Sequence, residues 1–189
     1  VIGAGNSGAH AVQMAVGMGA RVTVLDLDMR KLEALDAEYR GRVVTLMSNP
    51  ANIEHEVASA DLLIGAVLIP GARAPIVVSR QVVKSMRPGS AIVDIAIDQG
   101  GCIETIRPTS HEKPTYLQHG IVHYAVPNMP ALVGRTSTMG LTQATEPYLA
   151  MLVEKGIEKA LAENRGLAAG VNTRDGQITC DAVAIALGY

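Results

Sequence analysis

Short apolar runs alternate with longer segments of helical periodicity along the first two thirds of the chain. The runs that predict strands cover residues 1–2, 21–25, 42–46, 61–64, 90–94 and 121–126. Apolar side chains recur at helical spacing in three intervening segments, residues 7–19, 29–39 and 52–59. Successive strand–helix units of this kind predict an α/β domain with a mostly parallel, doubly wound sheet.

The pattern changes after Pro130, where the strand signals stop. Residues 141–156 and 157–162 have helical character, and Pro147 predicts an early start, a break or a kink in the first of these helices. We therefore expect an α/β domain over 1–133, with a truncated first strand, and a helical segment of a second domain over 134–189.

Three glycines stand between the first strand and the first helix, where residues 3–8 read GAGNSG. In a dinucleotide-binding turn, Gly3 permits the tight turn, Gly5 lets the backbone approach a pyrophosphate, and Gly8 lets helix and strand pack closely. The following helix would direct free N–H groups and its positive dipole end at the phosphates. The structural alternative is a plain tight turn, but the order of elements favours a Rossmann-type cofactor site.

An acidic residue, Asp26, ends the second predicted strand 18 positions after Gly8, close to the spacing of about 20 expected in such sites. A carboxylate there can accept hydrogen bonds from both hydroxyls of the adenosine ribose. It also repels a 2′-phosphate, which favours NAD over NADP. Arg30 and Lys31 lie a turn later, where they would soften that repulsion, and we include Lys31 among the cofactor-binding residues.

Charge and the length of the apolar runs indicate what kind of molecule this protein binds. The 16 basic and 18 acidic residues give a net charge of −2 without a run of either sign, so nothing indicates a surface for nucleic acid or a membrane. No apolar run approaches the roughly 20 residues of a membrane-spanning helix, and no leader is visible, which predicts a soluble, cytoplasmic protein. A small metabolite is the better candidate.

Cysteine and histidine offer no metal site. Cys102 and Cys180 have neither CxxC spacing nor a histidine partner, so neither a disulfide framework nor zinc is predicted. His111, His119 and His123 lack carboxylate or cysteine partners at ligand spacing, and the first two flank a hairpin-like stretch, so we interpret them as surface or structural residues. His10 and His55 are interpreted as helix-face residues.

Three later segments narrow the family: IGAVLIPGARAP over 64–75, VDIAIDQGGC over 93–102, and NMP over 128–130 with RTST over 135–138. They resemble the alanine dehydrogenase and pyridine nucleotide transhydrogenase family, and the resemblance runs the full length of the chain. Proton-translocating transhydrogenases share the fold and a similar IPG-x-x-AP loop. The aspartate at 98 and the NMP and RTST segments favour the dehydrogenase branch.

The resemblance implies site residues beyond the glycine turn and Asp26. Ser48 would lie near the adenine, and Val67 and Leu68 would pass beneath the cofactor. Asp98 would lie beside the nicotinamide ribose and the reacting carbon, where it would act as a catalytic residue by holding the ribose or influencing proton transfer. Its structural alternative is an aspartate that caps the loop before a Gly-Gly turn.

Two further residues, Asn128 and Met129, would line the nicotinamide end on the same resemblance. The implied reaction is reversible, NAD-dependent oxidative deamination of L-alanine to pyruvate and ammonia. The family's substrate-polarising lysine and histidine belong to an amino-terminal catalytic domain, which we expect to precede this segment. The family usually assembles as homo-hexamers. The alternatives are the nucleotide domain of a transhydrogenase and a dehydrogenase for a larger amino acid.

Overall fold

The computed structural model describes all 189 residues, and the chain divides into two compact units. Unit 1 comprises Val1–Ile69 and Arg73–Pro127, and unit 2 comprises Pro70–Ala72 and Asn128–Tyr189. The sequence predicted a domain boundary near residue 133, which is the end of a short 3₁₀ helix. The longer segment of unit 2 instead begins at Asn128, before that helix. That assignment of the domains stays a prediction, and the two units are described separately below.

Unit 1 is built on one sheet. Its strands are β1 (Val22–Asp26), β2 (Val43–Met47), β3 (Leu62–Gly65), β4 (Ala91–Asp94), β5 (Thr115–Gln118) and β6 (Ile121–Tyr124). The order across the sheet is β2-β1-β3-β4-β6-β5, with Ile2 bridging β1 and β3 in parallel register at Leu25 and Gly65. All pairings are parallel except that of β5 with β6. The strand order reverses at Ile2, which makes this position the switch point of a doubly wound sheet.

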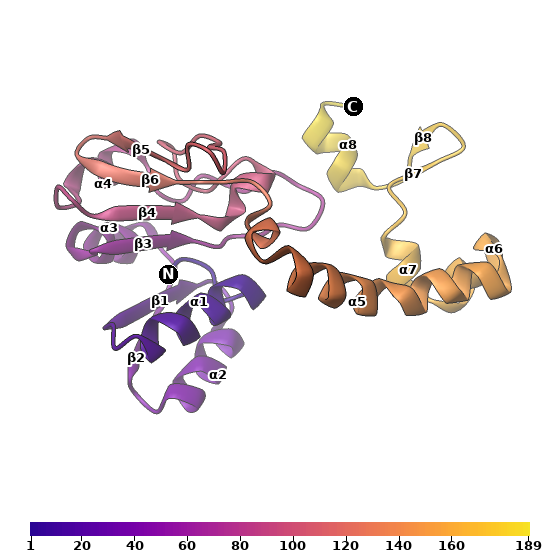
Figure 1. Ribbon diagram of the computed structural model, residues 1–189, viewed down its shortest axis with the longest axis horizontal. Coiled ribbons are helices and arrows are strands. Elements are labelled where there is room, and N and C mark those ends of the chain that lie inside the picture. Colours follow the sequence, from indigo (N-terminus) through magenta and orange to yellow (C-terminus); the bar gives the residue numbers. More distant parts are fainter. The chain divides into compact units, whose positions relative to one another are not determined.

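Helices cover both faces of this sheet, and each face has its own buried cluster. The helices of unit 1 are α1 (Asn6–Gly17), α2 (Met29–Tyr39), α3 (Pro50–Ser59), α4 (Arg80–Ser85) and the 3₁₀ helix η1 (Ile95–Gln99). Because side chains alternate along a strand, β1 directs Val24 to the cluster under α1 and α2 and Leu25 to the cluster under α3 and α4. Figure 1 shows α1 and α2 together beside β1 and β2.

The sequence predicted the parallel strands but missed smaller elements of unit 1. The expected first strand is a single bridging residue, Ile2. β5 was not predicted as a strand, although the hairpin-like stretch was noted, because its alternating burial gives only a four-residue signal. α4 and η1 are also new, being too short for a helical period to be recognised.

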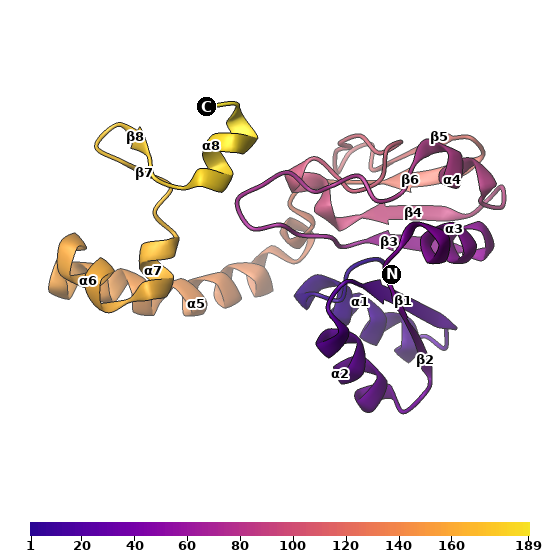
Figure 2. The same ribbon diagram turned by 180° about the vertical axis from the view of Figure 1, so that it is seen from behind.

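Unit 2 is mainly helical, as the turned view in Figure 2 also shows. It contains η2 (Met129–Val133), α5 (Gly134–Lys155), α6 (Ile157–Glu163), α7 (Arg165–Ala169), β7 (Thr173–Arg174), β8 (Gln177–Ile178) and α8 (Asp181–Leu187). The expectation that strands end after Pro130 was therefore wrong in one detail, since β7 and β8 form an antiparallel two-residue hairpin. α5 begins earlier than predicted and continues through Pro147. No helix of the chain combines the length and apolarity needed to cross a membrane.

Candidate cofactor-binding site

Two glycines of the turn after Ile2 are required by the fold itself. Gly3 has φ +99°, and a Cβ on it would lie 2.5 Å from the carbonyl oxygen of Ala66. A Cβ on Gly8 would lie 1.8 Å from the carbonyl oxygen of Gly3. Any larger residue at either position would push the first helix away from the sheet, so these glycines hold the turn against β3.

Gly5 is different, because no steric contact within the protein requires a glycine there. Its φ of −71° suits any residue, and no atom lies within 4 Å of the position that a Cβ would take. It is the N-cap of α1, which has no side-chain cap and no acidic residue in its first turn. The open space beside Gly5 therefore faces uncapped N–H groups at the positive end of a 12-residue helix, a geometry suited to an anion.

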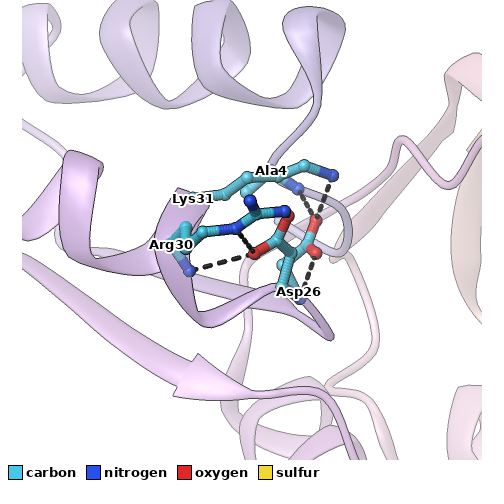
Figure 3. A network of polar contacts seen from close by, with 5 residues as sticks. Ala4, Asp26, Arg30 and Lys31 are labelled. Carbon is cyan, nitrogen blue, oxygen red and sulfur yellow. Dashed lines mark hydrogen bonds and ion pairs between the residues drawn. The ribbon is translucent and has the colours of Figure 1, made fainter.

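The carboxylate of Asp26 lies directly across from this turn (Figure 3). The backbone N–H of Ala4 donates to its Oδ2 over 2.6 Å, and the N–H of Asp28 donates to its Oδ1 over 2.8 Å. Because a carboxylate has about four acceptor positions, these two bonds fix its direction and leave capacity for further donors. Asp26 is therefore an oriented acceptor at the carboxyl end of β1, suited to a vicinal diol.

Lys31 and Arg30 interact with different carboxylates. The Lys31 ammonium lies 3.7 Å from Oδ2 of Asp26, on a side chain that is 46% exposed. Arg30 instead pairs with Asp28, which caps α2, through Nε at 3.3 Å, and this contact lowers the pKa of the Asp28 carboxyl. Of the two basic residues, Lys31 is the one adjacent to the acceptor proposed for the ribose.

The other predicted residues of unit 1 follow the carboxyl ends of neighbouring strands. Ser48 comes directly after β2, and its N–H donates to the carbonyl oxygen of Asp26 over 2.9 Å. Val67 and Leu68 follow β3; Val67 packs on the buried core, whereas Leu68 is 65% exposed. Asp98 lies in η1 with an exposed side chain. The structure thus gathers these residues at one edge of the sheet, around its switch point.

Asn128 and Met129 begin the longer segment of unit 2. Asn128 adopts the left-handed conformation, with φ 52°, which asparagine tolerates better than most residues, and it is the N-cap of η2. Its side chain is exposed, while Met129 is half-buried.

Comparisons with known proteins agree with this geometry. The model of the family described as alanine dehydrogenase/PNT, C-terminal domain, matches residues 1–181. This chain belongs to that family. An alanine dehydrogenase of Bacillus subtilis (strain 168) is 55% identical over 190 residues, covering 100% of this chain and 50% of the relative. The chain thus spans about half the length of the curated relatives it matches.

Solved structures extend the comparison to the fold. An L-alanine dehydrogenase structure superposes with a TM-score of 0.86 at 48% identity, over 99% of this chain and 52% of the other. A transhydrogenase from Sinorhizobium meliloti gives a TM-score of 0.76 at 24% identity, over 96% and 48% of the two chains, which shows the shared fold alone. The predicted family and the predicted Rossmann-type fold of NAD-binding domains are both confirmed.

One of the five histidines of this family member is buried. His123 on β6 is fully buried; its Nδ1 contacts the carbonyl oxygen of Ile121 at 3.0 Å, its Nε2 contacts Thr105 Oγ1 at 2.8 Å, and its ring stacks on Tyr116. Since a carbonyl only accepts, Nδ1 carries the proton and Nε2 accepts from the threonine hydroxyl. Burial lowers the pKa of His123, which supports a structural role. The other four histidines are not buried.

Sequence reasoning missed three residues at the same edge of the sheet. Ala66 contributes through its backbone. Its N–H donates to the carbonyl oxygen of Ile2 over 2.8 Å, and its own carbonyl oxygen lies 2.5 Å from the position that a Cβ on Gly3 would take. Asp94 is fully buried at the end of β4. Gln99 has a buried Oε1 without a hydrogen-bond partner in the protein. For Asp94, the signal in the sequence is a carboxylate at the end of an apolar strand.

Proposed function

We propose that this chain is the cofactor-binding half of an NAD-dependent alanine dehydrogenase. The reaction is L-alanine, NAD⁺ and water giving pyruvate, ammonium, NADH and a proton, and it is reversible. The observation that carries the proposal is the open space at Gly5, with the uncapped end of α1 on one side and the oriented Asp26 carboxylate beside it. The residues present fit a dinucleotide, because they offer an anion site and a diol acceptor side by side.

In this proposal, each residue binds a different part of the cofactor. Gly3, Gly5 and Gly8 receive the pyrophosphate, and Asp26 accepts the adenosine-ribose hydroxyls. The negative charge of Asp26 disfavours a 2′-phosphate and so favours NAD, while Lys31, 3.7 Å from that carboxylate, moderates the preference. Lys31 thereby also contributes to the ribose end of the site.

The remaining assignments rest on the resemblance. Ser48 lies near the adenine, and Val67 and Leu68 lie beneath the cofactor, which when bound supplies the hydride-accepting carbon. Asp98 binds the nicotinamide ribose or assists proton transfer beside that carbon. Asn128 and Met129 are assigned to the same end of the cofactor.

Unit 2 is proposed to be the return of the chain to the catalytic domain that makes up the other half of the relatives. Its longest helix, α5, has no buried residue, and Leu141, Leu149 and Val153 are all more than 60% exposed. Apolar surface of this extent favours a partner. We further propose that the full protein is cytoplasmic and assembles as a homo-hexamer, as the family resemblance predicts.

The transhydrogenase alternative has weaker support. The solved L-alanine dehydrogenase is twice as similar in sequence to this chain as the transhydrogenase, at 48% against 24% identity. Both share the fold, so the fold does not distinguish them. The dehydrogenase is therefore the proposed activity, with L-alanine as the substrate.

Gly5→Ala in the full-length protein tests the proposal. We expect the Kd for NADH to rise about tenfold, because a methyl group would occupy the space left for the pyrophosphate, while the free energy of unfolding falls by no more than about 1 kcal/mol, the usual cost of alanine at an N-cap. Gly17→Ala is the matched control: Gly17 belongs to the same helix and likewise has no atom near its Cβ position. Calorimetric titration of both variants makes the comparison, and equal NADH affinity in the two would overturn the proposed binding mode.

A further inference from the structure

Asp94 is the most deeply buried carboxylate of the chain and has every oxygen engaged. Its Oδ1 accepts the N–H of Ala96 over 2.9 Å, and its Oδ2 accepts the N–H of Cys102 over 2.8 Å and that of Ile103 over 3.2 Å. Its exposed fraction is 0%. A single carboxylate therefore ties together backbone groups from both sides of a loop.

The loop that these bonds close is residues 95–101, which we call the clamped segment. Its two ends also meet directly, since the N–H of Gly101 donates to the carbonyl oxygen of Ala96 over 3.0 Å. Asp98 and Gln99 lie between the tied ends. The clamped segment therefore presents an exposed carboxylate and a buried, unsatisfied amide oxygen at the carboxyl end of β4.

Glycines clear the space around this carboxylate. A Cβ on Gly101 would lie 3.0 Å from Oδ2 of Asp94 and 2.4 Å from Ile106. A Cβ on Gly65, the last residue of β3, would lie 3.3 Å from Oδ1 and 2.5 Å from the Cys102 sulfur. The close packing on both sides leaves the carboxylate little room to turn, so the ends of the clamped segment are held in one arrangement.

The clamp also joins the loop that follows β3. The N–H of Ala74 donates to the carbonyl oxygen of Gln99 over 2.9 Å, and the N–H of Val77 donates to that of Cys102 over 2.8 Å. These bonds fasten the start of the segment leading to α4 onto the residues that Asp94 holds. The segments that follow β3 and β4 are thus both tied to the residues that the buried carboxylate of Asp94 holds.

We propose that Asp94 is a positioning residue, which acts through the clamped segment to hold Asp98 against the nicotinamide half of the cofactor. The inference rests on the proposed function, in which Asp98 lies beside the nicotinamide ribose. Asp94 itself is buried and touches neither cofactor nor substrate. Burying a carboxylate is costly, and burial raises the pKa of Asp94, but no neutral side chain of this length offers two oxygens to three donors.

The test uses Asp94→Asn in the full-length protein and compares two ligands. The amide keeps the shape of the side chain but points an N–H₂ group at a backbone N–H. We expect the Kd for NADH to rise about tenfold, since a small displacement of a positioning loop has effects of this order or larger. ADP, which carries only the adenosine and phosphate parts, should bind within about twofold of wild type.

A double-mutant cycle separates positioning from general destabilisation. In an Asp98→Asn background, Asp94→Asn should change the Kd for NADH by less than about twofold, because the group through which it acts is already removed. Equal losses of NADH and ADP affinity, unchanged NADH affinity, or additive effects of the two substitutions would each overturn the inference. Wild-type protein that binds neither ligand would instead refute the proposed function.

Hydrogen exchange of the wild-type protein keeps the inference testable if Asp94→Asn does not fold. The amides of Ala96, Cys102 and Ile103, which donate to Asp94, should exchange about tenfold more slowly with saturating NADH than with saturating ADP. Equal protection by the two ligands would show that the clamp is not coupled to the nicotinamide end.

Discussion

The two units of this chain treat their apolar residues in opposite ways. In unit 1, two buried clusters fill the space between the sheet and its helices, and every buried hydrophobic residue of the chain except Ala160 belongs to this unit. In unit 2, the 22-residue helix α5 buries none of its side chains. Unit 1 therefore has the core of an independent domain, whereas the helices of unit 2 form no comparable core of their own.

The two units therefore differ in what they show about the cofactor site. Because the core of unit 1 is made of its own residues, the loops that follow its strands are held firmly enough to orient Asp26 and the glycine turn. Unit 2 offers mainly surface, and the role proposed for it depends on the half of the relatives that this chain does not span.

The largest contrast is expected in thiol reactivity, since each unit contains one cysteine. Cys102 is fully buried, and burial beside Asp94 raises the pKa of its thiol to about 12. At pH 8, only about one part in ten thousand of it is then thiolate, the reactive form. Half-exposed Cys180 in unit 2 should react with iodoacetamide about a thousandfold faster, as followed by mass spectrometry.

The control is Cys180→Ser, in which the fast reaction should vanish. Rapid labelling of two thiols in the folded wild-type chain would mean that the core of unit 1 opens readily.

The next contrast is in the cost of losing an apolar side chain. Ile92→Ala removes a fully buried residue of β4 and should lower the free energy of unfolding by about 3 kcal/mol. Leu149→Ala, at a residue of α5 that is 63% exposed, should cost less than about 0.5 kcal/mol in the 189-residue chain. Urea unfolding followed by circular dichroism measures both.

The same Leu149→Ala substitution in the full-length protein sharpens the comparison. If unit 2 packs against the other half of the protein, the cost should rise above about 1.5 kcal/mol. An equal, negligible cost in both proteins would argue against the proposed catalytic-domain partner for α5.

The smallest effect concerns pH and the buried histidine of unit 1. Burial lowers the pKa of His123 below its ordinary value of 6.5, so the unfolded chain binds the proton more readily than the folded one. The stability from neutral His123 is therefore present above about pH 6.5 and is lost as pH falls through the lower, folded value. The Tm should fall between pH 7.5 and 5, and less steeply in His123→Gln.

Comparing the two proteins at each pH isolates His123 from Asp94, whose raised pKa acts in the opposite direction. Parallel Tm profiles for wild type and His123→Gln would contradict the assignment of His123 as a neutral structural residue.

Much of unit 1 could be predicted from local patterns. The apolar runs predicted β1 to β4 and β6, and the glycine spacing with Asp26 predicted the turn that Ala4 and Asp26 close with a 2.6 Å hydrogen bond. Both are short-range signals. A short run of apolar residues predicts a buried strand, and the turn needs glycine where a Cβ would collide. The family could be predicted as well, from three segments of specific sequence.

Other features depend on contacts between distant residues. The carbonyl oxygen of Ala66, far from Gly3 in the sequence, lies 2.5 Å from the position that a Cβ on Gly3 would take, and only the folded chain brings these two residues together. Asp94 stood four residues before Asp98 with nothing local to distinguish its role, and its three N–H donors assemble only once the chain returns at Cys102 and Ile103. Local sequence determined the elements and the family, whereas tertiary structure decided which carboxylate faces outward and which holds the loop, since burial and acceptor geometry arise only from packing.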